Sequence, residues 1–267
     1  MARSHAHGAY AIDRLTHDSG MGGWNPAFKA VLALGTLVIC LAADCMAVSL
    51  AVIVSLAALQ RVKGGLPLGT YLGLLRVPLV FLLLGCLAVA FDLSRAPAGD
   101  WYVGLRWFYV CTTAGQLAAA AALLLKALGA VSAMYLLALT TTASELTGVL
   151  RRAHLPPLLC ELMYLIYRFI FVLLDTHERM HTAADARLGW RDFRTACRSF
   201  GGVAGNLLVL ALRKSRVYDD AMDARGYDGT LCFLEEDKPL RRVQLVWTAV
   251  FWAALLLLRL VARQKGA

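Results

Sequence analysis

Charged residues are scarce in this sequence: Asp, Glu, Lys and Arg make up 17% of the 267 residues, whereas hydrophobic residues make up 59%. A soluble globular domain has about 25% charged and about 45–50% apolar residues. The composition therefore excludes a soluble globular enzyme and a disordered chain. Acidic residues are the scarcer sign, with 18 against 27 basic residues and a net charge of +9. This excess is typical of positive cytoplasmic loops in a membrane protein, or of a surface for anionic lipid or an acidic partner.

Several motifs of catalytic and nucleotide-binding proteins are also missing. The sequence has no Gly-x4-Gly-Lys-Ser/Thr loop, because Lys214-Ser215 lacks the upstream glycine, so no phosphate-loop nucleotide site is expected. No Gly-x-Ser-x-Gly nucleophile elbow occurs either. The seven cysteines form no Cys-x-x-Cys pair, and most lie in apolar runs, where cysteine acts as a small hydrophobic residue. We expect no cofactor, no disulfide framework and no nucleic-acid partner.

The apolar runs predict an all-α, polytopic membrane protein with four to six transmembrane helices, since one span needs about 20 residues. We expect a polar N-terminal segment over 1–27 and transmembrane helices over 28–144. A cytoplasmic-face module follows over 145–242, and a last transmembrane helix and tail over 243–267. The module is placed at the cytoplasmic face because nine Lys or Arg lie between residues 176 and 226, too many for hydrocarbon.

The number of spans depends on segments that fit more than one arrangement. Phe28–Leu59 fits two short helices that turn near Asp44 better than one, and Asp44 is then a loop residue rather than an intramembrane acid. Trp107–Ser144 fits one long helix or two short ones, and Leu158–Leu174 either crosses the membrane or lies flat on it. Asp92–Arg106 is predicted to be a loop.

Histidines provide two possible metal ligand sets. His5, His7 and His17 lie in the polar N-terminal segment, where an isolated histidine pair is a weak indication of a metal. His177-Glu178-Arg179-Met180-His181 matches H-E-x-x-H, which on a helix places two imidazoles on one face for zinc, with the glutamate as base. An intramembrane zinc metalloprotease is therefore an alternative function. No recognisable third ligand follows, and the arginine-rich surroundings disfavour a dication.

A repeated pattern is the stronger indication. Asp185-Ala186-Arg187-Leu188-Gly189-Trp190 and Asp223-Ala224-Arg225-Gly226-Tyr227 share Asp-Ala-Arg, a glycine within two residues and an aromatic residue, 38 positions apart. Each glycine suits the left-handed residue that closes a helix, and an arginine is favoured at a helix C-terminus. Because its planar guanidinium pairs two acceptors at once, arginine suits docking on a protein partner. The other interpretation is a pair of arginines that extend to lipid headgroups.

Four arginines, at positions 187, 191, 194 and 198, would form a basic stripe if one helix continued past Gly189. Such a stripe is usually a solvated or lipid-facing surface, with anionic lipid as its functional ligand.

The sequence resembles the CbiQ family, the transmembrane coupling (T) components of energy-coupling-factor transporters for cobalt or nickel. The resemblance rests on Leu158–Gly189, which contains Tyr167-Arg168-Phe169, Arg179-Met180 and Ala186-Arg187-Leu188-Gly189, on Arg216–Gly229, and on Asn25-Pro26-Ala27-Phe28-Lys29. The first signature departs from a strict Ala-Arg-Gly by one inserted leucine, as is common in the cobalt branch. The resemblance makes H-E-x-x-H a coincidence.

The resemblance implies a non-catalytic subunit of a cobalt importer in the cell (inner) membrane. Its partners would be two cytoplasmic CbiO-like ATPases, a CbiM-like substrate-binding membrane subunit and, as a further candidate, a small CbiN-like subunit. The two signatures would end a pair of crossed coupling helices. Arg187 and Arg225 would each enter a groove on one ATPase, and the small residues beside them, Ala186, Gly189, Ala224 and Gly226, would allow close approach. A self-sufficient channel or permease remains a third possible function.

Overall fold

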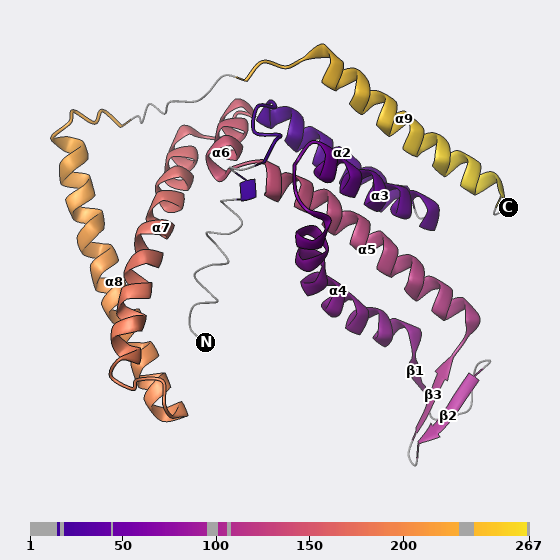
Figure 1. Cartoon of the computed structure of the whole chain (residues 1–267), viewed down its shortest axis with the longest axis horizontal. Helices are drawn as coiled ribbons and strands as arrows, with labels where there is room; N and C mark the ends of the chain where they lie inside the picture. Colours follow the sequence, from indigo (N-terminus) through magenta and orange to yellow (C-terminus); the bar gives the residue numbers. More distant parts are fainter. Residues whose placement is uncertain are drawn as a thin grey trace. The chain divides into compact units, whose positions relative to one another are not determined.

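The structure is a computed structural model that describes residues 15–16, 19–43, 45–94, 101–105, 108–229 and 238–265 (Figure 1). His5, His7, His17 and Asp44 lie outside the described residues. The described helices are α2 (Pro26–Ala43), α3 (Met46–Val62), α4 (Leu68–Ala90), α5 (Ala114–Thr140), α6 (Ala143–Arg152), α7 (Pro157–Asp185), α8 (Phe193–Asp223) and α9 (Arg242–Lys265).

The chain folds into two compact units. The first, called the membrane bundle, comprises Ile12–Thr142 and Asp237–Ala267. The second also includes Met1–Ala11, which lie outside the described residues, and its part Ala143–Glu236 is called the hairpin unit. Six of the described helices are long and apolar enough to cross a membrane, namely α2, α4, α5, α7, α8 and α9. The predicted all-α polytopic fold is confirmed.

Local sequence explains where the bundle helices begin and end. The Oδ1 of Asn25 accepts hydrogen bonds from the backbone N–H groups of Ala27 and Phe28, at 2.9 and 3.4 Å. Helix α2 therefore begins with an asparagine cap, and Pro26 follows in its first turn. The expected pair of short helices is present as α2 and α3. Of the predicted run Trp107–Ser144, Ala114–Thr140 forms one long helix, α5, which begins with a reciprocal cap between Thr113 and Gln116, whereas Phe108–Thr112 forms a strand.

A small antiparallel sheet connects α4 to α5, where a loop was expected over Asp92–Arg106. Its strands are β1 (Asp92–Ser94), β2 (Trp101–Leu105) and β3 (Phe108–Thr112), in the order β1-β3-β2. The letters WYVGL and FYVCT are rich in aromatic and β-branched residues, which favour strands. Pairing of β2 with β3 satisfies backbone groups that a loop would leave to water.

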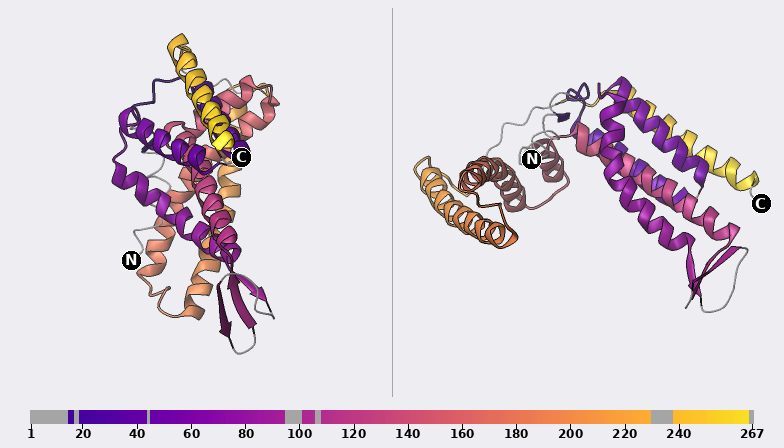
Figure 2. Two further views of the ribbon diagram at one scale, coloured as in Figure 1. Left: turned by 90° about the vertical axis from the view of Figure 1, so that its right-hand side faces the viewer. Right: turned by 60° about the horizontal axis from the view of Figure 1, so that its bottom comes forward.

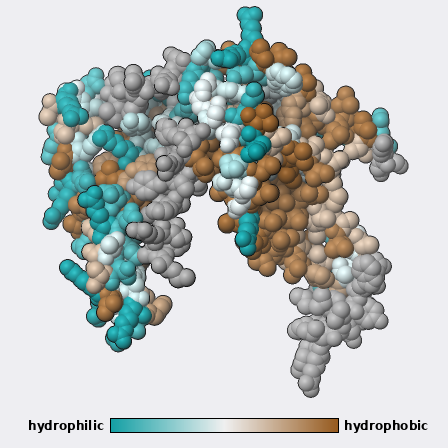
Figure 3. All heavy atoms as spheres, viewed as in Figure 1, coloured by the Kyte–Doolittle hydropathy of each residue, from teal (hydrophilic) through white to brown (hydrophobic). Residues whose placement is uncertain are grey.

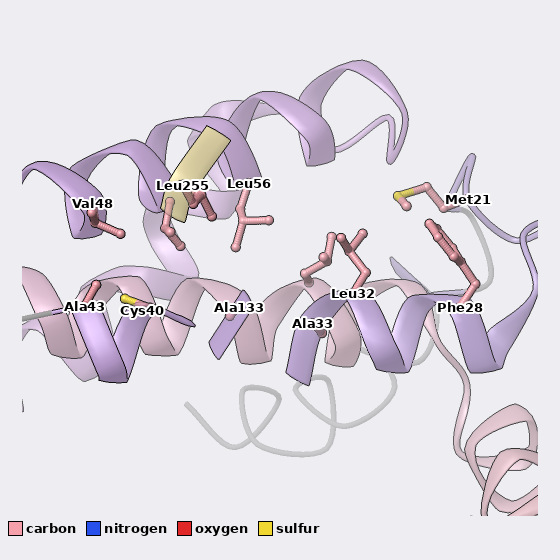
Figure 4. Close-up of a cluster of buried hydrophobic side chains, with 12 residues drawn as sticks. Met21, Phe28, Leu32, Ala33, Cys40, Ala43, Val48, Leu56, Ala133 and Leu255 are labelled. Atoms are coloured by element: carbon pink, nitrogen blue, oxygen red, sulfur yellow. The ribbon is translucent and has the colours of Figure 1, made fainter. Parts of the chain in front are cut away.

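The core of the bundle lies where α2, α3, α5 and α9 meet. Leu32, Val48, Leu56, Leu136 and Leu255 are all nearly inaccessible there, and Figure 4 shows such side chains pointing toward one another. Large apolar side chains also cover the outside of the bundle, seen as brown spheres in Figure 3. An apolar outer surface is what lipid requires, because hydrocarbon tails replace water as the solvent.

The hairpin unit consists of α6, α7 and α8. Pro157 occupies the first turn of α7, where its missing N–H is not needed. The helix continues past the apolar run Leu158–Leu174 to Asp185 without a break. The run is therefore the first part of one 29-residue helix. Residues 186–192 then reverse the chain, and α8 returns antiparallel beside α7 (Figures 1 and 2).

Candidate functional site

The first arginine signature forms the C-terminal end of α7. The backbone N–H of Leu188 donates to the Asp185 carbonyl at 2.9 Å, and the N–H of Gly189 donates to the Ala184 carbonyl at 2.9 Å. This pair of bonds is the Schellman arrangement, which satisfies carbonyls that the helix end would leave unpaired. Arg187 stands directly before the residue with positive φ, and its side chain is exposed.

The second signature repeats that geometry at the end of α8. The N–H of Gly226 donates to the Asp223 carbonyl at 3.0 Å, and the N–H of Tyr227 donates to the Met222 carbonyl at 3.1 Å. Arg225 again stands directly before the residue with positive φ and is exposed. The sequence repeat of 38 positions is therefore a repeat of backbone geometry, and the two arginines occupy equivalent places at two helix ends.

The glycines of the two signatures have different roles, so the prediction that each is the left-handed residue closing its helix is correct for only one of them. Gly226 has φ of +77° and is the expected left-handed residue. In the first signature that conformation falls on Leu188, with φ of +59°, and not on Gly189. Gly189 is required for space instead, because a Cβ there would lie 2.5 Å from Ser199 Oγ and 2.8 Å from the Ala184 carbonyl oxygen. The inserted leucine thus takes the left-handed position.

The aromatic residue that follows each signature ties the helix end back to α7. Trp190 stacks on His181, with ring centroids 4.6 Å apart and planes 17° from parallel. Tyr227 donates its hydroxyl to Glu161 Oε2 at 3.1 Å. Partial burial and then the Glu161 carboxylate raise the pKa of Tyr227 above its ordinary value, so the phenol remains a donor at neutral pH. Both helix ends are thereby held against the same helix.

The two guanidinium groups lie far apart within the hairpin unit. Neither forms an ion pair or a side-chain hydrogen bond with a residue that the structure describes. Tyr227 fixes the second signature beside Glu161, near the start of α7, whereas Arg187 follows its last residue. Positions 161 and 187 are 26 residues apart, which at 1.5 Å per residue is about 39 Å along the helix. The arginines are therefore at opposite ends of an antiparallel pair.

The predicted basic stripe is not one helix face. α7 ends at Asp185 and α8 begins at Phe193, so Arg187 and Arg191 lie in the turn between them. Of the four arginines in the predicted stripe, only Arg194 and Arg198 lie on α8. Together with Thr195 they line a shallow hollow of about 370 Å³. The assumption that a helix continues past Gly189 is wrong, because the Schellman bonds and the positive φ of Leu188 end it there.

Comparison with known proteins shows which family has this pattern. The model of the family described as CbiQ, cobalt transport protein, matches residues 20–237. The chain belongs to the CbiQ family. It is 31% identical over 224 residues to the cobalt transport protein CbiQ of Rhodobacter capsulatus, covering 83% of this chain and 86% of that one. The resemblance predicted from the sequence is confirmed, and the chain is a multi-pass membrane protein of a cobalt transport family.

Two other relatives are informative. An uncharacterized protein of Methanocaldococcus jannaschii is 27% identical over 248 residues, covering 92% of this chain and 91% of that one. A putative fused cobalt transport protein CbiMQ of Methanocorpusculum labreanum is 31% identical over 169 residues, which are 62% of this chain and 28% of the longer relative. The CbiQ part of that relative is thus joined to other sequence in a single chain.

Membership in the CbiQ family leaves the zinc protease alternative without support. His177 and His181 do lie on one face of α7, with ring centroids 5.9 Å apart. The His181 ring, however, stacks on Trp190 and so has a structural role at the turn. Over the described ranges no group of three His, Cys, Asp or Glu is placed to hold a metal ion.

Other residues of the CbiQ hairpin were not singled out by sequence reasoning. Arg168 lies over the Tyr218 ring, 5.3 Å from its centroid, and donates from Nη1 to the Tyr218 hydroxyl at 3.3 Å. Ser199 donates from Oγ to the Gly189 carbonyl at 2.9 Å. Glu161 is buried at the start of α7, and an acid inside an apolar run was the signal that could have found it.

Substitution of Gly189 by alanine is expected to destabilise the turn by about 1–3 kcal/mol, because the added Cβ collides with backbone that cannot rotate away. Gly201→Ala is the matched control: that glycine lies inside α8 with nothing within 4 Å of its Cβ position, so alanine should stabilise by about 1 kcal/mol. Amide hydrogen exchange over residues 184–200 measures both. Equal shifts of the same sign would contradict the close approach described for Gly189.

Proposed function

We propose that this chain is the energy-coupling transmembrane subunit of an energy-coupling-factor importer for cobalt. The observation that carries the proposal is the pair of helix ends with one backbone geometry and one exposed arginine each. A repeated geometry suits a repeated partner, and two copies of one ATPase present two copies of one groove. The basic side chains would pair with acceptors there, since arginine forms two parallel bonds to a carboxylate.

The separation of the two arginines supports two ATPase subunits rather than one. A span of about 39 Å along α7 exceeds the diameter of a small domain, which is about 30 Å, and this favours one partner at each helix end. The CbiQ hairpin would then lie across the pair, with Arg187 on one subunit and Arg225 on the other. Ala186 and Ala224 stand directly before the arginines, are exposed, and leave room for a partner to approach the backbone.

A substrate-binding membrane subunit completes the proposal. The fused CbiMQ relative joins the two names in one chain, which supports a CbiM-like partner here, with a CbiN-like subunit as a further candidate. Cobalt would bind to that partner, because the described residues of this chain offer no group of metal ligands. This chain would do no catalysis itself, and ATP hydrolysis would belong to the CbiO-like ATPases.

In this proposal residues 145–242 lie at the cytoplasmic face, although α7 and α8 are each long and apolar enough to span. The charged residues at the end of α7 and throughout the turn favour this placement. ATP binding would draw the ATPases together. The two arginines would carry that motion into α7 and α8, and these coupling helices would tilt or release the substrate-binding subunit.

The test is reconstitution of the complex. The chain is purified with the ATPases and the CbiM-like subunit of the same organism and placed in liposomes. We expect ATP-dependent cobalt uptake only when all components are present, and no flux with this chain alone. Cobalt flux through the chain alone would indicate a self-sufficient permease and would refute the coupling role. Uptake of nickel in preference to cobalt would change the cargo and leave the coupling role intact.

A further inference from the structure

Two peptide segments link the membrane bundle to the hairpin unit. The chain leaves the bundle after Thr142 and returns to it at Asp237. A displacement of Ala143–Glu236 reaches the bundle covalently through these two segments, while Met1–Ala11, which belong to the same compact unit and join the bundle at Ile12, lie outside the described residues. Thr140 is the last residue of α5, just before the first link, and Lys238 is the first described residue after the second. One short segment at the start of α2, Asn25–Lys29, binds the backbone at both places.

Lys29 binds the backbone at the end of α5, before the first link. Its side chain is 0% exposed, and its Nζ donates to the Thr140 carbonyl oxygen at 2.6 Å. A buried ammonium is costly unless it is hydrogen-bonded, and the last carbonyls of a helix lack partners of their own. The negative end of the α5 dipole adds to the attraction. Lys29 therefore closes the end of α5 two residues before the chain leaves the bundle.

Asn25 binds the backbone at Lys238, after the second link. Its Nδ2 donates to the Lys238 carbonyl oxygen at 2.7 Å, while its Oδ1 caps α2. The side chain is 4% exposed, so both halves of the amide are used inside the protein. The chain that returns from the hairpin unit is thus fixed to the start of α2 just before α9 begins.

The segment that precedes Asn25 is itself braced. Thr16 Oγ1 donates to the Ala138 carbonyl of α5 at 3.2 Å. The Gly20 N–H donates to the Gly64 carbonyl in the loop after α3 at 3.3 Å, and a Cβ on Gly20 would lie 2.6 Å from the Lys63 carbonyl oxygen. The start of α2, the end of α3, the end of α5 and the start of α9 therefore meet at one end of the bundle.

We propose that Asn25 and Lys29 are positioning residues for transport, which hold both exits of the hairpin unit on the membrane bundle. A pull on either link then moves the ends of α5 and α9 with α2, rather than extending the links. This inference rests on the proposed coupling function. It adds that the efficiency of coupling depends on two hydrogen bonds in the bundle, away from the arginine signatures.

Lys29→Met tests the first bond, because methionine keeps most of the buried chain and removes the donor. In the reconstituted complex we expect the number of cobalt ions imported per ATP hydrolysed to fall at least fivefold. Affinity for the ATPases should stay unchanged. Lys29→Arg, which retains a cationic donor, should recover more than half of the ratio, whereas a purely structural role would change the yield and leave the ratio alone.

Asn25→Asp tests the second bond, because aspartate keeps the Oδ1 cap on α2 and removes the Nδ2 donor to Lys238. We again expect at least a fivefold fall in the ratio. Ser132→Ala is the matched control, since it removes a buried hydrogen bond to the Leu128 carbonyl in α5 that lies away from both links. Its ratio should equal that of the wild type.

Amide hydrogen exchange on the chain alone separates this inference from the proposed function. Exchange should quicken at 138–142 in Lys29→Met and at 238–242 in Asn25→Asp. Unchanged exchange in both, or an unchanged ratio, would overturn the inference, as would an equal fall in Ser132→Ala. If the wild-type chain binds no ATPase, the proposed coupling function is wrong, and so is the claim that Asn25 and Lys29 act in transport. Faster exchange in the two variants would still show that the two hydrogen bonds hold the ends of the links.

Discussion

Replacement of both Arg187 and Arg225 by glutamate is expected to abolish ATPase binding and cobalt uptake while the chain still inserts in the membrane. Each guanidinium is exposed and unpaired in the described part of the chain, so the loss falls on the partner rather than on the fold. Removal of one member of a buried interfacial charge pair costs about 2–5 kcal/mol, and a reversed charge adds repulsion. Two such losses should weaken binding at least about 1,000-fold, where 1.4 kcal/mol is tenfold.

The matched control is the double variant Arg213→Glu and Arg216→Glu. Both of these arginines are exposed inside α8, at least nine residues before Arg225, and the change in net charge is the same. Binding is measured by co-purification and by titration of the ATPases onto the chain in nanodiscs. Loss of binding in the control would attribute the effect to net charge. Full binding in the signature variant would refute docking through these residues.

Substitution of Gly35 by leucine is expected to detach α9 from α2. A Cβ on Gly35 would lie 2.2 Å from Cζ2 and 2.5 Å from Cη2 of Trp252, so the indole rests directly on the glycine. Trp252 also donates from Nε1 to Thr36 Oγ1 at 3.2 Å. Small residues let transmembrane helices approach closely. Leucine would displace the ring and break this bond, and overpacking of this kind costs about 1–3 kcal/mol before the hydrogen bond is counted.

Gly73→Leu provides the comparison, because that glycine lies in α4 with nothing within 4 Å of its Cβ position. Thermal unfolding of both variants in detergent should show a large loss for Gly35→Leu and no loss for Gly73→Leu. Cysteine cross-linking between α2 and α9 would report the separation directly. A Gly35→Leu protein as stable as the wild type would show that the indole moves away at little cost.

The sequence predicted the elements that depend on local composition. Length and hydropathy gave α2 and α3 as two helices, because Phe28–Leu59 is too long for one span. The Asp-Ala-Arg repeat predicted two equivalent helix ends, and their backbone bonds are the same. These features could be predicted because each is decided within one or two turns of helix.

The parts that failed have two causes. Gly189 has no room for a Cβ because it lies against Ser199, ten residues away, and a local pattern does not show such a contact. The basic stripe failed because Leu188, a residue that rarely takes a positive φ, closes α7, so the turn separates Arg187 and Arg191 from α8. Glu161 has its partner at Tyr227, 66 positions along the chain, and no local pattern predicts that pair.

Because α7 and α8 run antiparallel, the length of the hairpin fixes the separation of the two helix ends. With one arginine at each end, the distance between the two arginines is set by the number of residues in the helices rather than by their chemistry. Because one turn takes 3.6 residues, four residues inserted at matching places in α7 and α8 would increase that distance by about 6 Å and rotate the helix ends by about 40°. In the proposed docking, the chain length between Glu161 and Arg187 would therefore set how far apart the two ATPase contacts lie.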